Sequence, residues 1–252
     1  MSNMKIPMLA GIVLLAGLTA LASGQAPETI AAGGGGIAIH PINHATFVME
    51  YGGTTIYVDP VGGADVFSSF DPPDVILITH IHGDHTSAET VAGVSTDQTL
   101  ILAPTTVADK LGSDVEGDLK IIANGESYKR PGLEVEAIPA YNLSEDRLEF
   151  HPKERGDNAY VVTIGGTRIF ISGDTEDTPE MRALENIDAA FLCMNLPYTM
   201  TVERAADATL AFAPKIVYPY HYRGKGGMSD LEAFTTIVAA DPKIEVRLLQ
   251  WY

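Results

Sequence analysis

Four side chains of types that bind divalent metals lie within six residues, in the segment Thr79–Thr86. His80 and His82 are two residues apart at the end of an apolar run, so in a strand they point the same way and can share one ion. The turn that follows carries Asp84 and His85 to the other side. This spacing favours two metal ions a few ångströms apart over a single ion. The alternative is a solvated polar loop.

Two later residues occupy comparable positions, each directly after a run that is typical of a strand. Asp174 follows the run Thr167–Ser172, where its carboxylate can bridge two ions. Its alternative role is the N-cap of a helix that begins near Thr178. His221 follows the run Lys215–Tyr220 and is a further candidate ligand, or else a core imidazole whose partners are backbone groups.

Two glycine pairs mark the turns of two similar predicted hairpins, each followed by an acidic residue. The hairpin strands are Ala45–Tyr51 with Thr54–Val58, and Tyr160–Ile164 with Thr167–Ser172. The other predicted strands are Asp74–Thr79, Thr99–Ala103, Leu119–Ile122, Leu133–Ala140, Ile187–Leu192, Lys215–Tyr220 and Ile244–Leu249. The predicted helices are Ser87–Val94, Pro104–Leu111, Val202–Phe212 and Leu231–Ala239. We therefore predict an α/β fold of two pseudo-duplicated β-rich halves, in which two sheets pack face to face with helices outside.

The composition restricts the class of partner. The chain of 252 residues has 16 Lys and Arg against 33 Asp and Glu, which gives a formal net charge of -17. Proteins that bind nucleic acids or anionic membranes need a basic face, so this balance argues against both functions. The single cysteine, Cys193, allows neither an intrachain disulfide nor a zinc site built from several cysteines.

The N-terminal residues 1–24 have the pattern of a secretory signal peptide. Lys5 precedes the uncharged apolar run Ile6–Ala22, and small residues follow it. We expect cleavage near Ala22 or Gly24. An uncleaved membrane anchor is the alternative, although the run is at the short limit for a bilayer span. In both cases we expect the folded domain outside the cytoplasm.

The rest of the chain is predicted to be one domain. Residues 25–36 contain four consecutive glycines, which indicates a flexible linker. The folded domain is therefore predicted to span residues 37–252.

The candidate ligands resemble the sequence signature of the metallo-β-lactamase fold. The residues THIHGDH match its HxHxDH motif, and Gly173-Asp174-Thr175 and His221 match its later ligand positions in order. Within that superfamily the chain is most similar to the branch named after ascorbate-phosphate lactonase. The matching segments are Asn43–Thr46 with the following IYVDP, Ala140–Asn142 with His151–Lys153, and Met194–Met200.

The resemblance implies a four-layer αββα sandwich with a dinuclear metal centre. The implied ligands are His80, His82 and a third residue for the first ion, Asp84, His85 and His221 for the second, and a bridging Asp174. The ions, zinc in preference to manganese or iron, would hold a hydroxide that attacks an electrophilic carbonyl or phosphorus. With only one ion, Asp84 would instead orient or deprotonate the water. The resemblance places His44 at the site as a proton donor or substrate contact.

The third ligand departs from the pattern of many superfamily members, because the chain lacks their short GHxxG-like loop. His151 is the only histidine between His85 and Asp174, and it lies in the polar loop Tyr141–Asp157. We predict that His151 completes the first ligand set, with a lid residue or a surface residue as the alternatives. The predicted substrate-binding residues are Tyr141, Asn142, Lys153, Tyr198 and Arg223.

These features predict a secreted hydrolase that acts on an ester, lactone, amide or phosphodiester bond of a small molecule. No nucleic-acid partner is expected, and membrane contact is expected only if the N-terminal segment is an anchor. The alternative is a non-catalytic member of the fold that binds a metal or another ligand, against which the complete ligand set argues. Asp59, which follows the first hairpin, is predicted to support a ligand rather than to bind metal.

Overall fold

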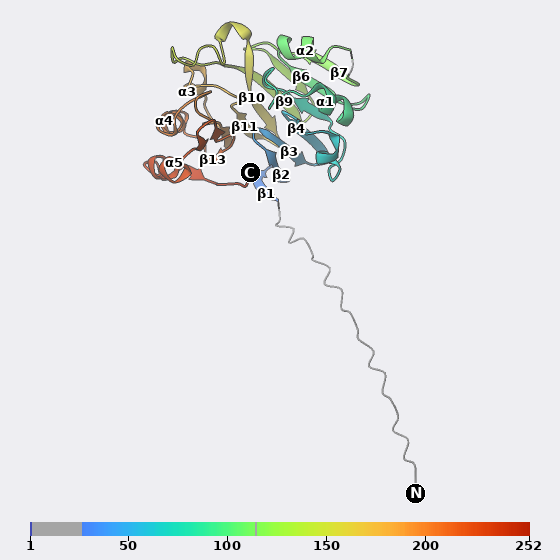
Figure 1. Ribbon diagram of the computed structural model, residues 1–252, viewed down its shortest axis with the longest axis horizontal. Helices are drawn as coiled ribbons and strands as arrows, with labels where there is room; N and C mark the ends of the chain where they lie inside the picture. Colours follow the sequence, from blue (N-terminus) through green and yellow to red (C-terminus); the bar gives the residue numbers. More distant parts are fainter. Residues whose placement is uncertain (2–26, 114) are drawn as a thin grey trace.

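Two seven-stranded sheets form the centre of the molecule (Figure 1). The computed structural model describes residue 1, residues 27–113 and residues 115–252, so the predicted signal peptide and its cleavage site lie outside the described residues. The first sheet consists, in order, of β1 (Glu28–Ala32), β2 (Gly35–Asn43), β3 (Thr46–Tyr51), β4 (Thr54–Val58), β5 (Val75–Leu77), β6 (Leu100–Ala103) and β7 (Asp118–Ile121). The second has the order β16 (Glu245–Val246), β13 (Ile216–Pro219), β12 (Ala189–Leu192), β11 (Thr167–Ile171), β10 (Asp157–Ile164), β9 (Leu133–Ala140) and β8 (Ser127–Arg130). A separate ribbon pairs β14 (Arg223–Gly224) with β15 (Gly227–Met228).

The two halves of the chain repeat one topology. In the first sheet, β1 to β4 pair antiparallel and β4 to β7 pair parallel. In the second sheet, β8 to β11 pair antiparallel, and β11, β12, β13 and β16 pair parallel. Strand order and strand direction therefore agree between the halves, which confirms the predicted pseudo-duplication.

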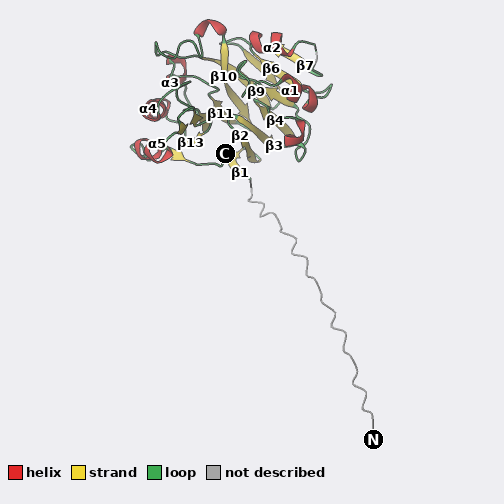
Figure 2. Cartoon of the chain, viewed as in Figure 1, coloured by secondary structure: helices red, strands yellow, loops and turns green. Residues whose placement is uncertain are grey.

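Helices cover the outer face of each sheet (Figure 2). The helices over the first sheet are α1 (Ala88–Val94) and α2 (Thr105–Leu111), with the 3-10 helix η1 (Ala64–Phe67) beside them. Those over the second are α3 (Pro179–Arg182), α4 (Val202–Phe212) and α5 (Leu231–Val238). Strand β3 shows the layering, because Phe47 and Met49 face the core between the sheets while Val48 packs beneath α1 and α2. The fold is the predicted four-layer αββα sandwich.

The predicted linker is wrong over residues 28–36, which form β1, a turn and the start of β2, while residues 25 and 26 lie outside the described residues. Ile30 of β1 pairs with Ile37 of β2, and both side chains are buried. Gly34, with φ 88°, makes the turn between the two strands, and the Gly33 amide donates to the Gly165 carbonyl at 2.8 Å. The glycines thus make another Gly-Gly hairpin turn, in which only the second glycine has a positive φ, whereas both glycines do in the turns from β3 to β4 and from β10 to β11.

Two further differences concern the edges of the second sheet. Strand β8 was not predicted, and the predicted last strand, Ile244–Leu249, pairs only over Glu245–Val246. Among the residues that the structure describes, no helix has the length and apolar character needed to span a bilayer.

Candidate metal centre

The predicted ligands meet at one edge of the sandwich, on the segments that follow the strands. Asp59 follows β4, Thr79–His85 follow β5, Asp174 follows β11 and His221 follows β13. In the described part of the chain, five non-glycine residues have positive φ, and three of them lie here: His44 at 51°, Asp59 at 44° and His221 at 43°. Such backbone strain persists where the surrounding structure fixes it, and it concentrates at functional sites.

Ligand atoms from the predicted residues form three overlapping clusters, in each of which all atoms lie within 4.8 Å of one another. The clusters are His80 with His82 and His151, His80 with His85 and Asp174, and Asp84 with His85 and His221. The first and third match the two predicted ligand sets, and His151 is the third member of the first. Asp174 lies between them, 3.5 Å from the Nε2 atoms of both His85 and His221 and 3.6 Å from Nε2 of His151. The Asp174 carboxylate therefore faces both predicted ligand sets.

Three of the converging atoms are buried and have no hydrogen-bond partner. They are Nε2 of His85, Nε2 of His151 and Oδ1 of Asp174. Buried polar atoms are nearly always paired, and each one left unpaired costs about 1–3 kcal/mol. A divalent cation satisfies this set, because neutral imidazole and carboxylate are its usual ligands. The residues present therefore fit a metal centre.

A hydrogen-bond network behind His80 and His85 turns one nitrogen of each toward the centre. Asp59 is fully buried, and its Oδ2 accepts from Nδ1 of His85 at 2.7 Å and from the Thr79 hydroxyl at 2.7 Å. Because that hydroxyl already donates its hydrogen bond to Asp59, it accepts one from Nδ1 of His80 at 3.0 Å. Nε2 is therefore the nitrogen that each imidazole turns to the centre, and in His80 this atom is unprotonated. Asp59 thus contacts the candidate ligand His85 directly and His80 through Thr79, which agrees with the supporting place predicted for it.

The guanidinium group of Arg155 contacts two of the predicted ligands, His82 and His151. Arg155 ends the 3-10 helix η2 (Lys153–Arg155) and donates from Nη1 to Nε2 of His82 at 3.1 Å and from Nη2 to Nδ1 of His151 at 3.0 Å. Its Nε also donates to both carboxylate oxygens of Asp157, at 2.9 and 2.8 Å.

Further side chains hold His221 and Asp174 in place. Asn195 donates from Nδ2 to Oδ2 of Asp174 at 3.1 Å and lies 3.2 Å from Nε2 of His221. His44 packs behind His221, with 3.4 Å between their Nδ1 atoms. Arg223 donates to Nε2 of His44 at 2.8 Å and stacks over the ring of Tyr252. His44 thus contacts His221, and Arg223 contacts His44. Neither residue lines the pocket at the centre, so the structure does not place them as the predicted substrate contacts.

Burial and mutual charge set the protonation of the ligands. Burial and the charge of His85 hold the pKa of His80 well below its usual value, and burial is the main reason that the pKa of His82 falls to about 4. For His85, burial favours the neutral ring, but Asp174 and Asp59 outweigh it and hold the pKa well above the usual value. Burial also opposes ionisation of Asp174, yet the imidazoles of His221 and His85 hold its pKa well below the usual value.

A family model described as a beta-lactamase superfamily domain matches residues 38–221. The match spans all the predicted ligands. The chain belongs to the metallo-β-lactamase superfamily.

Relatives and solved structures of the superfamily agree with this assignment. A metal-dependent hydrolase of the UPF0173 group from Pyrococcus abyssi is 29% identical over 216 residues, which are 81% of this chain and 93% of the relative. A UPF0173 metal-dependent hydrolase from Geobacillus is 31% identical over 191 residues, 71% of this chain and 82% of the relative. A crystal structure of a protein from Parabacteroides distasonis is 37% identical, with a TM-score of 0.79, and covers 89% of this chain and 99% of its own.

The candidate metal centre opens into a pocket of about 420 Å³. Its lining residues are His82, Gly83, Asp84, Phe150, His151, Asp174, Asn195 and Tyr198. Of the predicted substrate-binding residues, only Tyr198 lines it. Its ring meets that of Phe150 edge-on, with 5.1 Å between the ring centroids.

The other residues of the predicted substrate set point elsewhere. Asn142 is buried and donates to the backbone carbonyls of Arg147 and Tyr198. Tyr141 donates to Glu180 at 2.9 Å, and Lys153 donates to the Tyr141 hydroxyl at 3.1 Å. The loop is polar because these groups hold it against the body of the protein, and the sequence alone does not separate such contacts from substrate contacts.

Four residues at the site were not predicted as members: Thr79, Phe150, Arg155 and Asn195. Thr79 directly precedes the HxHxDH motif, and Asn195 follows β12 as His80 follows β5 in the other half. The repeated topology was therefore a signal that pointed to Asn195. No comparable sequence signal distinguishes Arg155 from the other charged residues of its loop.

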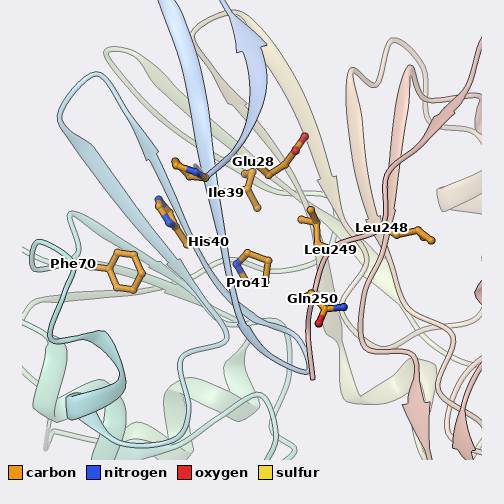
Figure 3. A pocket seen from close by; sticks show the side chains of 9 residues that line it. Glu28, Ile39, His40, Pro41, Phe70, Leu248, Leu249 and Gln250 are labelled. Atoms are coloured by element: carbon orange, nitrogen blue, oxygen red, sulfur yellow. The ribbon is translucent and has the colours of Figure 1, made fainter. Parts of the chain in front are cut away.

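A second groove, of about 370 Å³, is lined by none of the predicted metal-binding residues (Figure 3). It lies between β1, β2, the loop that carries Phe70 and the C-terminal segment Leu248–Gln250. His40 lines it, 2.7 Å from Glu50 and edge-on to Phe70. His40 is thus a histidine with its own partners outside the metal centre.

Proposed function

We propose that the protein is a metal-dependent hydrolase that binds two divalent ions, zinc by preference, at this centre. The observation that carries the proposal is the convergence of buried, unpartnered ligand atoms from His85, His151 and Asp174. They come from three separate segments, and a coordinated cation is the group that pairs with all of them at once. The names of the UPF0173 relatives support the same activity.

The residues of this chain have distinct tasks in that reaction. Divalent ions bound here would supply Lewis acidity and an activated water. Asp59 and Thr79 keep the Nε2 atoms of His80 and His85 directed at the centre. Asp84 lies on the pocket lining, 3.4 Å from Nε2 of His221, where its carboxylate can take a proton or act as a ligand.

The pocket favours a small, neutral substrate with an apolar group. Its walls beyond the ligands are Gly83, Phe150, Asn195 and Tyr198, none of which is charged. Aromatic side chains bind acyl or aryl groups well. We therefore propose a carboxylic ester or a lactone as the scissile group, with amides and phosphodiesters as the alternatives to be tested.

Metal analysis combined with a substrate panel tests the proposal. The purified full chain is expected to contain up to two divalent ions, and to hydrolyse p-nitrophenyl esters or lactones faster than an amide or bis-p-nitrophenyl phosphate. Metal removal should abolish the activity, and zinc should restore it. Bound metal without turnover on any substrate of the panel would instead favour a non-catalytic binder.

We also propose that the protein acts outside the cytoplasm. The support is the charge and size pattern of residues 1–24. N-terminal sequencing of exported protein is expected to start between Ser23 and Ala26. Retention of Met1 in membrane fractions would favour the anchor, and a cytoplasmic protein with Met1 retained would contradict export.

A further inference from the structure

Arg155 occupies the space between the first ligand set and a buried carboxylate. Its side chain is 16% exposed, and that of its partner Asp157 is 1% exposed. The guanidinium contacts two of the three histidines of the first set, His82 and His151. Neither the sequence motif nor the proposed reaction assigns it a role.

The chemistry of this contact decides which nitrogen of each histidine carries the proton. A guanidinium only donates hydrogen bonds, and a neutral imidazole has one N–H and one lone pair. Nε2 of His82 and Nδ1 of His151 must therefore offer their lone pairs to Arg155. The protons then lie on Nδ1 of His82 and Nε2 of His151.

These protonated nitrogens are the atoms that face the centre. Nδ1 of His82 lies 3.1 Å from Nε2 of His80, to which it can donate because Thr79 leaves that atom unprotonated. Nε2 of His151 lies 3.6 Å from Oδ2 of Asp174. While the contact with Arg155 persists, neither histidine has a lone pair to offer a metal.

We infer that Arg155 competes with the metal at the first position and makes it the weaker of the two. Binding there requires the guanidinium to leave both imidazoles, whose ring protons then move to the outer nitrogens. Asp157 is placed to accept a hydrogen bond from the Nδ1–H group that His151 would then have, since its Oδ2 lies 3.6 Å from that nitrogen. A carboxylate in that place is the usual partner of a metal-bound histidine.

The second position contrasts with the first. There, Nδ1 of His85 already donates to Asp59 and its Nε2 faces the Asp174 carboxylate at 3.5 Å, so no guanidinium has to leave this ligand before a metal binds. The two positions are therefore expected to fill in order, the second before the first. This inference rests on the proposed metal centre and not on hydrolysis, so a failed substrate panel leaves it intact.

Zinc titration of the metal-stripped full chain against a competing chelator tests the inference. In the wild type, a second equivalent should bind more weakly than the first or not at all. Arg155→Gln removes the charge and leaves an amide that can accept from an imidazole N–H. This variant should bind the second equivalent at least tenfold more tightly, with the first unchanged. Arg155→Lys, which keeps a charged donor, should resemble the wild type.

A matched control separates the contact from the charge of the loop. Lys153→Gln removes a cation two residues away that pairs with Tyr141 and Glu180, so its zinc affinities should stay as in the wild type. Long-range ¹⁵N–¹H spectra of the metal-stripped wild type should show the Nε2–H form of His151. Unchanged or weaker binding of the second equivalent in Arg155→Gln, or the Nδ1–H form of His151 in the wild type, would overturn the inference.

Discussion

Nδ1 of His85 donates to Oδ2 of Asp59 at 2.7 Å, and neither side chain is exposed to solvent. The other oxygen of Asp59 accepts from the Thr79 amide at 2.7 Å, so the carboxylate is surrounded by donors. The backbone of Asp59 takes a positive φ of 44° to reach this place. One buried carboxylate thereby sets the orientation and the proton position of a ligand.

Asp59→Asn should weaken metal binding at the second position. An asparagine amide has only one acceptor, so its NH2 group must face either the Thr79 amide or Nδ1 of His85. If the NH2 group faces the Thr79 amide, two hydrogen-bond donors oppose each other. If it faces Nδ1 of His85, that nitrogen must accept, and the ring proton is held on Nε2, the predicted ligand atom. Loss of such an outer partner typically costs ~10–100-fold in metal affinity or activity. Zinc competition measures it, and Asp74→Asn, whose carboxylate lies at the far end of β5 and accepts from the Thr55 amide, is the control.

Asp174→Ala should lose both ions, because its carboxylate lies between the two ligand sets. We expect the loss to exceed the ~10–100-fold that follows removal of an outer partner. Elemental analysis of the purified variant measures the metal content. Asp118→Ala, at the exposed edge of the first sheet, provides the control. Full metal content in Asp174→Ala would refute the bridging role.

The motif, the strand pattern and the family resemblance predicted which residues the structure brings together as candidate ligands. His80 and His82 follow a buried strand, and Asp174 and His221 follow strands in the other half, so the edge where strands end brings them together. The direction of His80 and His82 was predicted from the two-residue period of a strand, but β5 ends at Leu77, so the loop after it sets their direction.

The surroundings of the ligands were less predictable. The contacts of Arg155, Asn142 and Lys153 depend on how one long loop folds back, and no periodicity describes an irregular loop. The glycines at 33–36 were interpreted as a linker because composition alone does not show whether a partner strand is available. Pairing of β1 with β2 provides that partner, and it is a tertiary property.

His151→Ala tests the first ligand set. If His151 is a ligand, the ion shared by His80 and His82 should be lost while the ion at Asp84, His85 and His221 stays. At a zinc concentration that fills both positions of the wild type, metal content would therefore fall from two equivalents toward one. Unchanged metal content with a higher KM or lower kcat would instead indicate a lid residue. His40→Ala, which removes a histidine of the second groove, should change neither quantity.

The metal-stripped protein should lose stability as the pH falls from about 6.5 to about 4. Mainly because of burial, the pKa values of His44 and His82 are lowered from 6.5 to about 4, and that of His80 is lowered well below 6.5. In this window the unfolded chain binds more protons than the folded chain, so folding becomes less favourable. His85 does not offset the loss, because its raised pKa adds stability that is already complete below pH 6.5.

Above pH 6.5 His85 lowers the stability as the pH rises. The reason is that its contribution to the free energy of unfolding is lost as the pH rises through the pKa of His85 in the folded state. The melting temperature in excess chelator should therefore be highest near pH 6.5 and decline on both sides. His44→Gln should flatten the acid side in part. A melting temperature that rises steadily from pH 6.5 to 4 would contradict the prediction.

Phe150→Ala should weaken substrate binding without changing metal content. Phe150 and Tyr198 form the aromatic wall of the pocket, with 5.1 Å between ring centroids, and neither contributes a ligand atom. An aromatic contact contributes about 0.5–1.5 kcal/mol beyond its buried area, so KM for an aryl or acyl ester should rise roughly 2- to 12-fold or more. If the wall only binds the apolar group, kcat should change little. Tyr198→Phe keeps the ring and should behave as the wild type, whereas an equal fall in kcat and kcat/KM for Phe150→Ala would show that the ring acts in the chemical step instead.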